Sequence, residues 1–279
     1  MLHSLVSLLL FALPLEVHAG KAPQDPALVI QSGGNQKTFR RSELLKRKDA
    51  VTLDIDYDPA FPGKKLHYRA VPAHALFEGI DIPKDATIQF KCLDGFSGPM
   101  DPKKLLNSSS SGSIAYLAIE TADEKWPAIN PPADTRTAAP FYLVWMDPKK
   151  SGIGQEQWPF QLAGFEVKGA LASAFPAIQV DSKLPASSPA RRGLETFVKT
   201  CFPCHTLNKQ GEAQMGPDLN FPKNPTEYFT ESTLKAFIRD PQSLHYFPQS
   251  KMTPFTKEAL PDKDLSEVVA YLRHMSKRR

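Results

Sequence analysis

The sequence is poor in cysteine: its 279 residues hold three, at positions 92, 201 and 204. The disulfide framework that stabilises many small secreted proteins needs more cysteines than this. The chain also lacks, after its N-terminus, an apolar run near the roughly 20 residues of a transmembrane helix. Charge is nearly balanced, with 34 Lys+Arg against 30 Asp+Glu, so nothing indicates a nucleic-acid-binding surface. We therefore expect no nucleic-acid partner and no stable membrane insertion.

The only apolar run opens the chain. Leu5–Leu15 forms a short apolar core, and Val17-His18-Ala19 follows as a small-residue cleavage site. Because the run is shorter than a membrane helix, the sequence predicts a signal peptide over residues 1–19, cut near Ala19. The mature protein is then exported and periplasmic. A signal peptide normally begins with a positively charged region, and no Lys or Arg precedes this apolar run. An uncleaved membrane anchor is therefore the alternative.

Proline is abundant, with 26 residues, about twice the usual ~5%, which predicts many loops. One stretch, FPAIQVDSKLPASSPA, is rich in Pro, Ser and Ala and has no sustained periodicity. It indicates a flexible linker over residues 175–189. The sequence therefore predicts two domains, over residues 20–174 and 190–279.

The first domain contains short strand-like runs separated by turns such as Pro62-Gly63 and Asp94-Gly95. The clearest runs are Val51–Ile55, Thr87–Phe90, Ile114–Ile119 and Phe141–Trp145. Helical candidates are short, at Ser42–Lys48 and Ala73–Phe77. This pattern predicts a mixed α+β domain.

After the linker, apolar residues recur at helical spacing. One set ends at a cysteine: Leu194, Phe197, Val198 and Cys201. A second set lies near the end of the chain: Leu265, Val268, Val269 and Leu272. Acidic residues at Asp262 and Asp264 suit the first turn of this last helix. A third helix over Glu231–Arg239 stops at Asp240-Pro241, so the second domain is predicted to be all-α.

A histidine directly follows the cysteine pair, in the order Cys201-x-x-Cys204-His205. This spacing holds two thiols at one helix end for thioether bonds to haem vinyl groups, and the histidine can bind the iron. A zinc site needs further Cys or a paired His, and none follows. A redox C-x-x-C favours a thioredoxin-like βαβ setting, which this segment lacks. The motif predicts one covalent haem c.

Three further motifs accompany this one: Gly193, Phe197 and Cys201 at intervals of four, GPDL over residues 216–219, and AYLRHM over residues 270–275. With them, residues 188–279 resemble class I c-type cytochromes. The resemblance implies that the first helix packs on the last one, and that the Pro217 carbonyl holds the second ring nitrogen of His205. One family feature is missing, because no Trp follows Trp158.

The second axial ligand to the iron has several candidates. QSKMTPF, around Met252, resembles the ligand segment of the same family and implies Met252 as a thioether ligand. Met215 follows His205 by only ten residues, too near to reach the opposite haem face. Met275 lies in the terminal helix, where a methionine packed in the core is a better interpretation than an iron ligand. Bis-histidine ligation through His245 is the alternative.

In the first domain, FKCLDGFSGPM, AYLAIE and APFYLVW follow one another. They resemble the sulfite oxidase-type molybdopterin-binding domain over Lys37–Lys168. In that family a cysteine in its own loop binds molybdenum, whereas Cys92 lies in a strand–turn segment, and the domain is short for enclosing a pterin. We therefore expect the fold without its cofactor, and Cys92 as a buried free thiol. A metal ligand or redox thiol is the alternative.

Together these features predict an exported electron carrier rather than a stand-alone enzyme. With His205 and Met252 on the iron, no position stays open for a substrate, and the first domain is expected to dock an unidentified redox partner. From Ser188 onward, 14 Lys+Arg against 10 Asp+Glu leave +4, which suits an acidic partner. The alternatives are a molybdenum-dependent, sulfite dehydrogenase-like oxidoreductase that passes electrons to its fused haem, and an assembly or sensor protein using Cys92.

Overall fold

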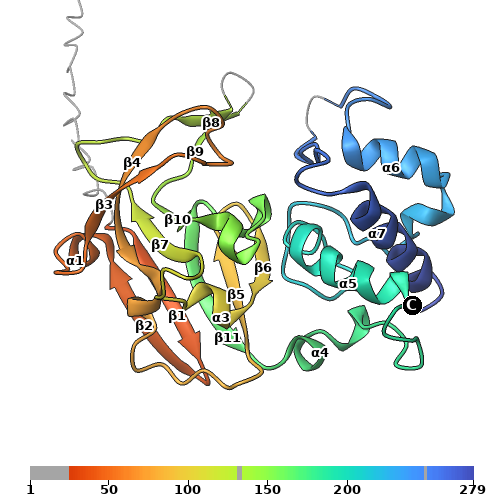
Figure 1. The fold of residues 1–279 in the computed structure, drawn as a ribbon, viewed down its shortest axis with the longest axis horizontal. Helices are drawn as coiled ribbons and strands as arrows, with labels where there is room; N and C mark the ends of the chain where they lie inside the picture. The colour runs from red at the N-terminus through yellow and green to blue at the C-terminus, as the bar shows by residue number, and fades with distance from the viewer. Residues whose placement is uncertain (1–24, 131–133, 248–249) are drawn as a thin grey trace, which may run out of the picture.

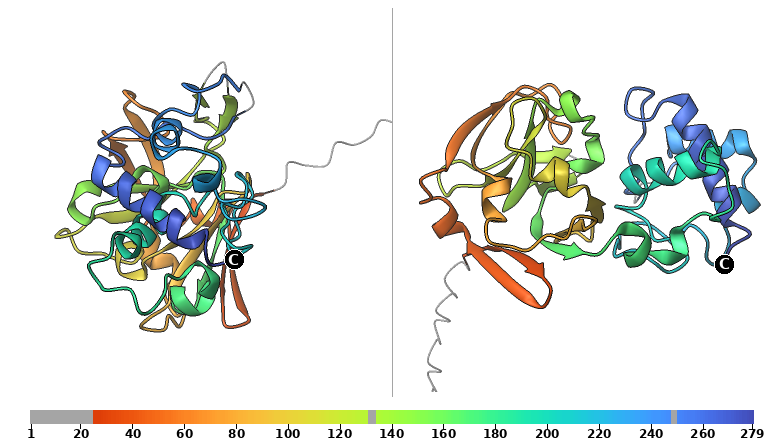
Figure 2. Two further views of the ribbon diagram at one scale, coloured as in Figure 1. Left: turned by 90° about the vertical axis from the view of Figure 1, so that its right-hand side faces the viewer. Right: turned by 60° about the horizontal axis from the view of Figure 1, so that its bottom comes forward.

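The computed structural model describes residues 25–130, 134–247 and 250–279. A β-sheet domain and a helical domain lie side by side (Figures 1 and 2). The predicted signal peptide over residues 1–19, with its cleavage site near Ala19, falls outside the described residues. Within the residues described, no helix is both long and apolar enough to cross a membrane.

Two sheets build the N-terminal domain. The five-stranded sheet has the order β2 (Asn35–Arg40), β1 (Ala27–Ser32), β11 (Leu162–Lys168), β5 (Thr87–Cys92) and β6 (Ser97–Met100). In it β1 and β11 are parallel, and the other neighbours are antiparallel. The antiparallel four-stranded sheet has the order β10 (Phe141–Met146), β7 (Ile114–Ile119), β4 (Leu66–Pro72) and β3 (Val51–Ile55). A separate hairpin pairs β8 (Ala128–Asn130) with β9 (Asp134–Thr137).

The helices of this domain are single turns: α1 (Arg41–Leu44), α2 (Ala73–Leu76) and α3 (Pro102–Leu105), with 3₁₀ turns η1 (Pro148–Ser151) and η2 (Gln155–Gln157). The four strand-like runs expected from the sequence all lie in strands. Both helical candidates overlap a single-turn helix, and α1 is shorter than the helix expected at residues 42–48. The N-terminal region is therefore a sheet-rich α+β domain, as predicted.

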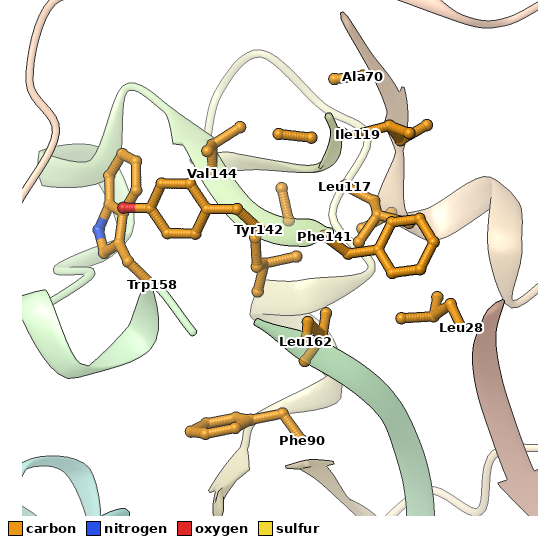
Figure 3. Packing of buried hydrophobic residues seen from close by; sticks show 14 of the residues in the cluster. Leu28, Ala70, Phe90, Leu117, Ile119, Phe141, Tyr142, Val144, Trp158 and Leu162 are labelled. Atoms are coloured by element: carbon orange, nitrogen blue, oxygen red, sulfur yellow. The ribbon is translucent and has the colours of Figure 1, made fainter. Parts of the chain in front are cut away.

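The core of the N-terminal domain is formed by side chains from both sheets, as Figure 3 shows. Leu28 of β1, Phe90 of β5 and Phe141 of β10 all belong to this cluster. A buried carboxylate, Asp58, accepts hydrogen bonds from the hydroxyls of Tyr68 at 2.6 Å and Tyr142 at 2.8 Å. These bonds satisfy a polar group that would otherwise be costly to bury.

The helical domain consists of α5 (Pro189–Thr200), η4 (Pro225–Glu227), α6 (Glu231–Arg239) and α7 (Asp262–Met275). The three predicted helices are present, and α6 ends before Asp240-Pro241 as expected. The first and last helices pack closely. The ring of Phe197 on α5 lies 5.0 Å from that of Tyr271 on α7, and Arg192 donates to the Glu267 carboxylate at 2.6 Å.

The segment predicted as a flexible linker is instead folded onto the helical domain (Figure 2, right). After α4 (Leu171–Ala174) and η3 (Pro176–Ile178), the side chains of Phe175, Ile178 and Val180 are buried in the helical core. Their apolar character outweighs the Pro, Ser and Ala around them, because burying such side chains is favourable by about 1.5–3 kcal/mol each. The expected flexible tether is therefore wrong for this part of the segment.

The two domains are joined by backbone hydrogen bonds as well as by the chain. Ser97 N in β6 donates to the Pro203 carbonyl at 3.0 Å, and Gln214 N donates to the Gly95 carbonyl at 2.9 Å. Figure 1 shows β6 on the side of the sheet domain that faces α5. The β5–β6 hairpin thus rests directly on the turn that carries the cysteine pair.

Charged side chains continue this contact. Glu212 of the helical domain lies 3.1 Å from Lys91 and 2.7 Å from Lys168 of the sheet domain. Both lysines also pair with Glu166. Because none of the four side chains is more than partly exposed, the network fixes the relative placement of the domains better than an isolated surface pair would.

Candidate haem-binding site

The Cys201–His205 segment forms one further turn at the end of α5. Cys201 N donates to the Phe197 carbonyl at 2.8 Å, and both Cys204 N and His205 N donate to the Cys201 carbonyl, at 3.1 and 2.9 Å. The ring of Phe202 is buried and anchors the turn in the helical core. The turn therefore presents both thiols and the imidazole together, as the C-x-x-C-H spacing predicts.

The orientation of His205 is fixed by its neighbours. Its Nδ1 donates to the Pro217 carbonyl at 2.8 Å, the contact that the resemblance implies. A Cβ at Gly216 would lie 2.4–3.0 Å from the ring atoms of His205, so only glycine leaves room for the ring. Burial lowers the pKa of the His205 imidazole, which favours the neutral form that binds a metal. With Nδ1 engaged, Nε2 is the nitrogen left for iron.

The two thiols are free and partly buried. Burial raises the pKa of the Cys201 thiol to about 11, and the Glu156 carboxylate adds to the rise. Burial also raises the pKa of the Cys204 thiol, again with a contribution from Glu156. Two thiols and one tethered imidazole are the donor set that covalent haem requires. The residues present therefore fit haem c. Cys201 and Cys204 would attach it, and His205 would bind its iron.

This turn and its three-helix setting define a c-type cytochrome domain. Residues 188–272 match the family model described as "Cytochrome C oxidase, cbb3-type, subunit III". A domain of this family carries covalently bound haem c and transfers electrons through it. The match covers most of the helical domain and none of the sheet domain. No curated protein matches the chain.

Met252 lies in a different part of the helical domain from the cysteine turn. Its partly buried side chain packs against a cluster formed by Leu234, Ile238, Phe255, Leu260, Leu265 and Val269. Cys201 packs instead against the cluster around Phe197 and Tyr271. Met252 and Cys201 thus belong to different clusters, and Met252 stays the predicted thioether ligand.

The other candidate ligands have other surroundings. Met215 packs against the core of the sheet domain, with its sulfur 4.0 Å from that of Cys204. Met275 is fully buried in the helical core. His245 is exposed and lies against the ring of Phe247. His274, an ordinary residue of α7 rather than a candidate ligand, accepts a hydrogen bond at Nε2 from Asp181 N at 3.2 Å.

Met252→Ala is expected to lower the reduction potential of the haem by on the order of 0.1 V or more, because axial ligands set potentials over a range of about 0.8 V and a thioether favours Fe(II). The weak methionine-to-iron absorption band of the oxidised protein should disappear. Spectroelectrochemistry measures both changes. Met215→Ala is the control and should leave both nearly unchanged. An unaltered spectrum and potential in Met252→Ala would reassign the ligand to His245.

Cys92 ends β5 and is partly buried. Burial raises the pKa of its thiol well above the usual value, with smaller contributions from Asp94 and Cys204. The thiol is therefore protonated and poorly nucleophilic, as a buried free cysteine is expected to be. Among the described residues, no group of three His, Cys, Asp or Glu side chains gathers in a way that could hold a metal ion.

One residue near the thiols, Glu156, has no recognisable signal in the sequence. It lies in η2 of the sheet domain, within a segment, SGIGQEQ, that matches no motif. Its carboxylate influences both Cys201 and Cys204. Such proximity depends on how the two domains dock, and no local pattern of residues encodes that.

Proposed function

We propose that the protein is an exported electron carrier with a single haem c, attached through Cys201 and Cys204 and with His205 and Met252 as axial ligands. The observation that carries this proposal is the cysteine–histidine turn with the His205–Pro217 hydrogen bond. The haem supplies a one-electron Fe(III)/Fe(II) couple. Cys201 and Cys204 would hold the haem, the Pro217 carbonyl fixes the His205 imidazole, and with His205 and Met252 both bound the iron would offer no site for a substrate.

The sheet domain, in this proposal, has a molybdopterin-type fold without the cofactor and docks a redox partner. Two features support this role. Cys92 ends β5, and the β5–β6 hairpin contacts the haem-attaching turn. The domain is also held against that turn by the Ser97–Pro203 bond, so a partner docked on it lies near the haem.

Purified full-length protein from an exporting, haem-attaching host tests the function. We expect one haem iron per chain and a one-electron redox transition. Ascorbate should reduce the full chain and a chain of residues 170–279, which keeps the packed linker, at similar rates. A membrane fraction of the native organism should reduce the shorter chain more slowly. Molybdenum near one per chain, with oxidation of sulfite, would instead make the sheet domain catalytic, and equal rates with the membrane fraction would refute docking.

A further inference from the structure

The sheet domain lines a cavity next to the cysteine turn. The cavity, of about 210 Å³, lies between η2, α5 and the loop that leads into α7. Gln155 and Glu156 face it from η2, Thr196 and Thr200 from α5, and Leu260 from the loop. It is partly open, so water can reach the Glu156 carboxyl group from one side.

Glu156 has little to stabilise its charged form. Gln155 Nε2 donates to its Oε1 at 3.0 Å, and among the described residues no cation forms an ion pair with it. Burial raises the pKa of Glu156 to about 7. A carboxyl group with this environment changes protonation near neutral pH.

Four charged side chains face this region from the neighbouring elements. Lys199 and Glu195 come from α5 and Asp264 from α7, and Lys104 of α3 lies near Lys199. Lys199 is engaged with the sheet domain, where its Nζ donates to the Gly152 carbonyl at 2.7 Å. Glu195 is exposed, so water screens its charge. Glu156 is partly buried, and among these side chains it is the carboxyl group that influences both haem-attaching sulfurs.

We propose that Glu156 is a redox-linked protonation site that the sheet domain contributes to the haem. This inference rests on the function proposed above. When a one-electron donor protein reduces Fe(III) to Fe(II), the Glu156 carboxylate takes up one proton from water in the cavity. On oxidation the carboxyl group returns it. Electron transfer is thereby coupled to proton transfer.

The coupling follows from electrostatics. An added electron makes the site more negative, which disfavours a nearby carboxylate and raises the pKa of the carboxyl group in the reduced state. Partial burial weakens screening between the two charges. By linkage, the reduction potential then falls as pH rises between the pKa values of the oxidised and reduced states. The sheet domain would in this way set the pH dependence of a haem that it does not bind.

The test is a spectroelectrochemical titration of haem-loaded full-length protein from about pH 5 to about pH 9, a range that brackets a carboxyl group titrating near neutrality. In the wild type the potential should fall with pH around neutrality. Glu156→Gln should lose this fall and keep the higher, low-pH potential throughout. Glu195→Gln removes the same charge from a different wall of the same cavity, at an exposed site on α5, and this variant should titrate like the wild type.

Reduced-minus-oxidised infrared spectra give a second measurement. A protonated-carboxyl band should appear on reduction of the wild type and be missing from Glu156→Gln. A Glu156→Gln protein with the wild-type pH dependence would overturn the inference and leave the electron-carrier function intact. A full-length protein without covalent haem would overturn both.

Discussion

Replacing Cys201 and Cys204 together by serine is expected to abolish covalent haem attachment completely. Serine hydroxyls do not add to haem vinyl groups, and the turn offers no other thiol in the C-x-x-C position. The wild-type chain should keep its haem through acid–acetone extraction and on denaturing gels, as judged by haem staining. The double variant should lose it under both conditions. Haem released from the wild type would contradict the site.

Cys92→Ser is the matched control for this experiment. The thiol of Cys92 lies close enough to Cys204 for Cys204 to contribute to its raised pKa, yet Cys92 belongs to a different domain and ends a β-strand. Its replacement should leave covalent haem unchanged and cost only a modest amount of stability. Loss of haem in Cys92→Ser would mean that this thiol assists attachment.

The sequence was sufficient to predict the features that depend on residues close together in the chain. Helix periodicity and the Asp240-Pro241 stop place α6 and α7, and the C-x-x-C-H spacing places the haem-attaching turn. Glycine positions were informative as well. Gly95 adopts a positive φ of 89° in the turn predicted at Asp94-Gly95, a conformation that glycine adopts without strain.

Features that depend on distant residues were missed. The parallel pairing of β1 with β11 joins strands more than 100 residues apart, and no local pattern specifies it. Burial of Phe175 and Ile178 in the helical core was hidden by the Pro- and Ser-rich composition around them. Glu156 is near the thiols only because the domains dock, so the sequence offered no reason to single it out.

Docking also changes how the two-domain organisation is understood. A flexible tether would raise the local concentration of the haem domain near a bound partner. In the structure the domains are instead held by a fixed contact. The backbones of Ser97 and Gly95 form hydrogen bonds with Pro203 and Gln214, which lie on either side of His205 in the sequence. A fixed domain can act on the haem itself, through charges such as that of Glu156, as well as on the partner.

The last large effect is expected at Gly193, where α5 crosses α7. A Cβ there would lie 2.0 Å from the Glu267 carbonyl oxygen and 2.8 Å from the Tyr271 Cβ. Because these are backbone and near-backbone atoms, Gly193→Ala must push the helices apart and weaken the Phe197–Tyr271 contact. We expect the helical domain to lose about 3 kcal/mol of unfolding free energy or more, at the upper end of overpacking costs.

Gly169→Ala is the matched control, because a Cβ at Gly169 meets no atom within 4 Å, and its effect should stay within about 0.5 kcal/mol. Urea unfolding of the haem-loaded protein, followed by haem absorbance, measures the helical domain separately from the sheet domain. Alanine is the better helix former by about 1 kcal/mol, so propensity alone would make Gly193→Ala more stable. An unchanged or raised stability in Gly193→Ala would therefore show that α5 and α7 do not meet as closely as the structure has them.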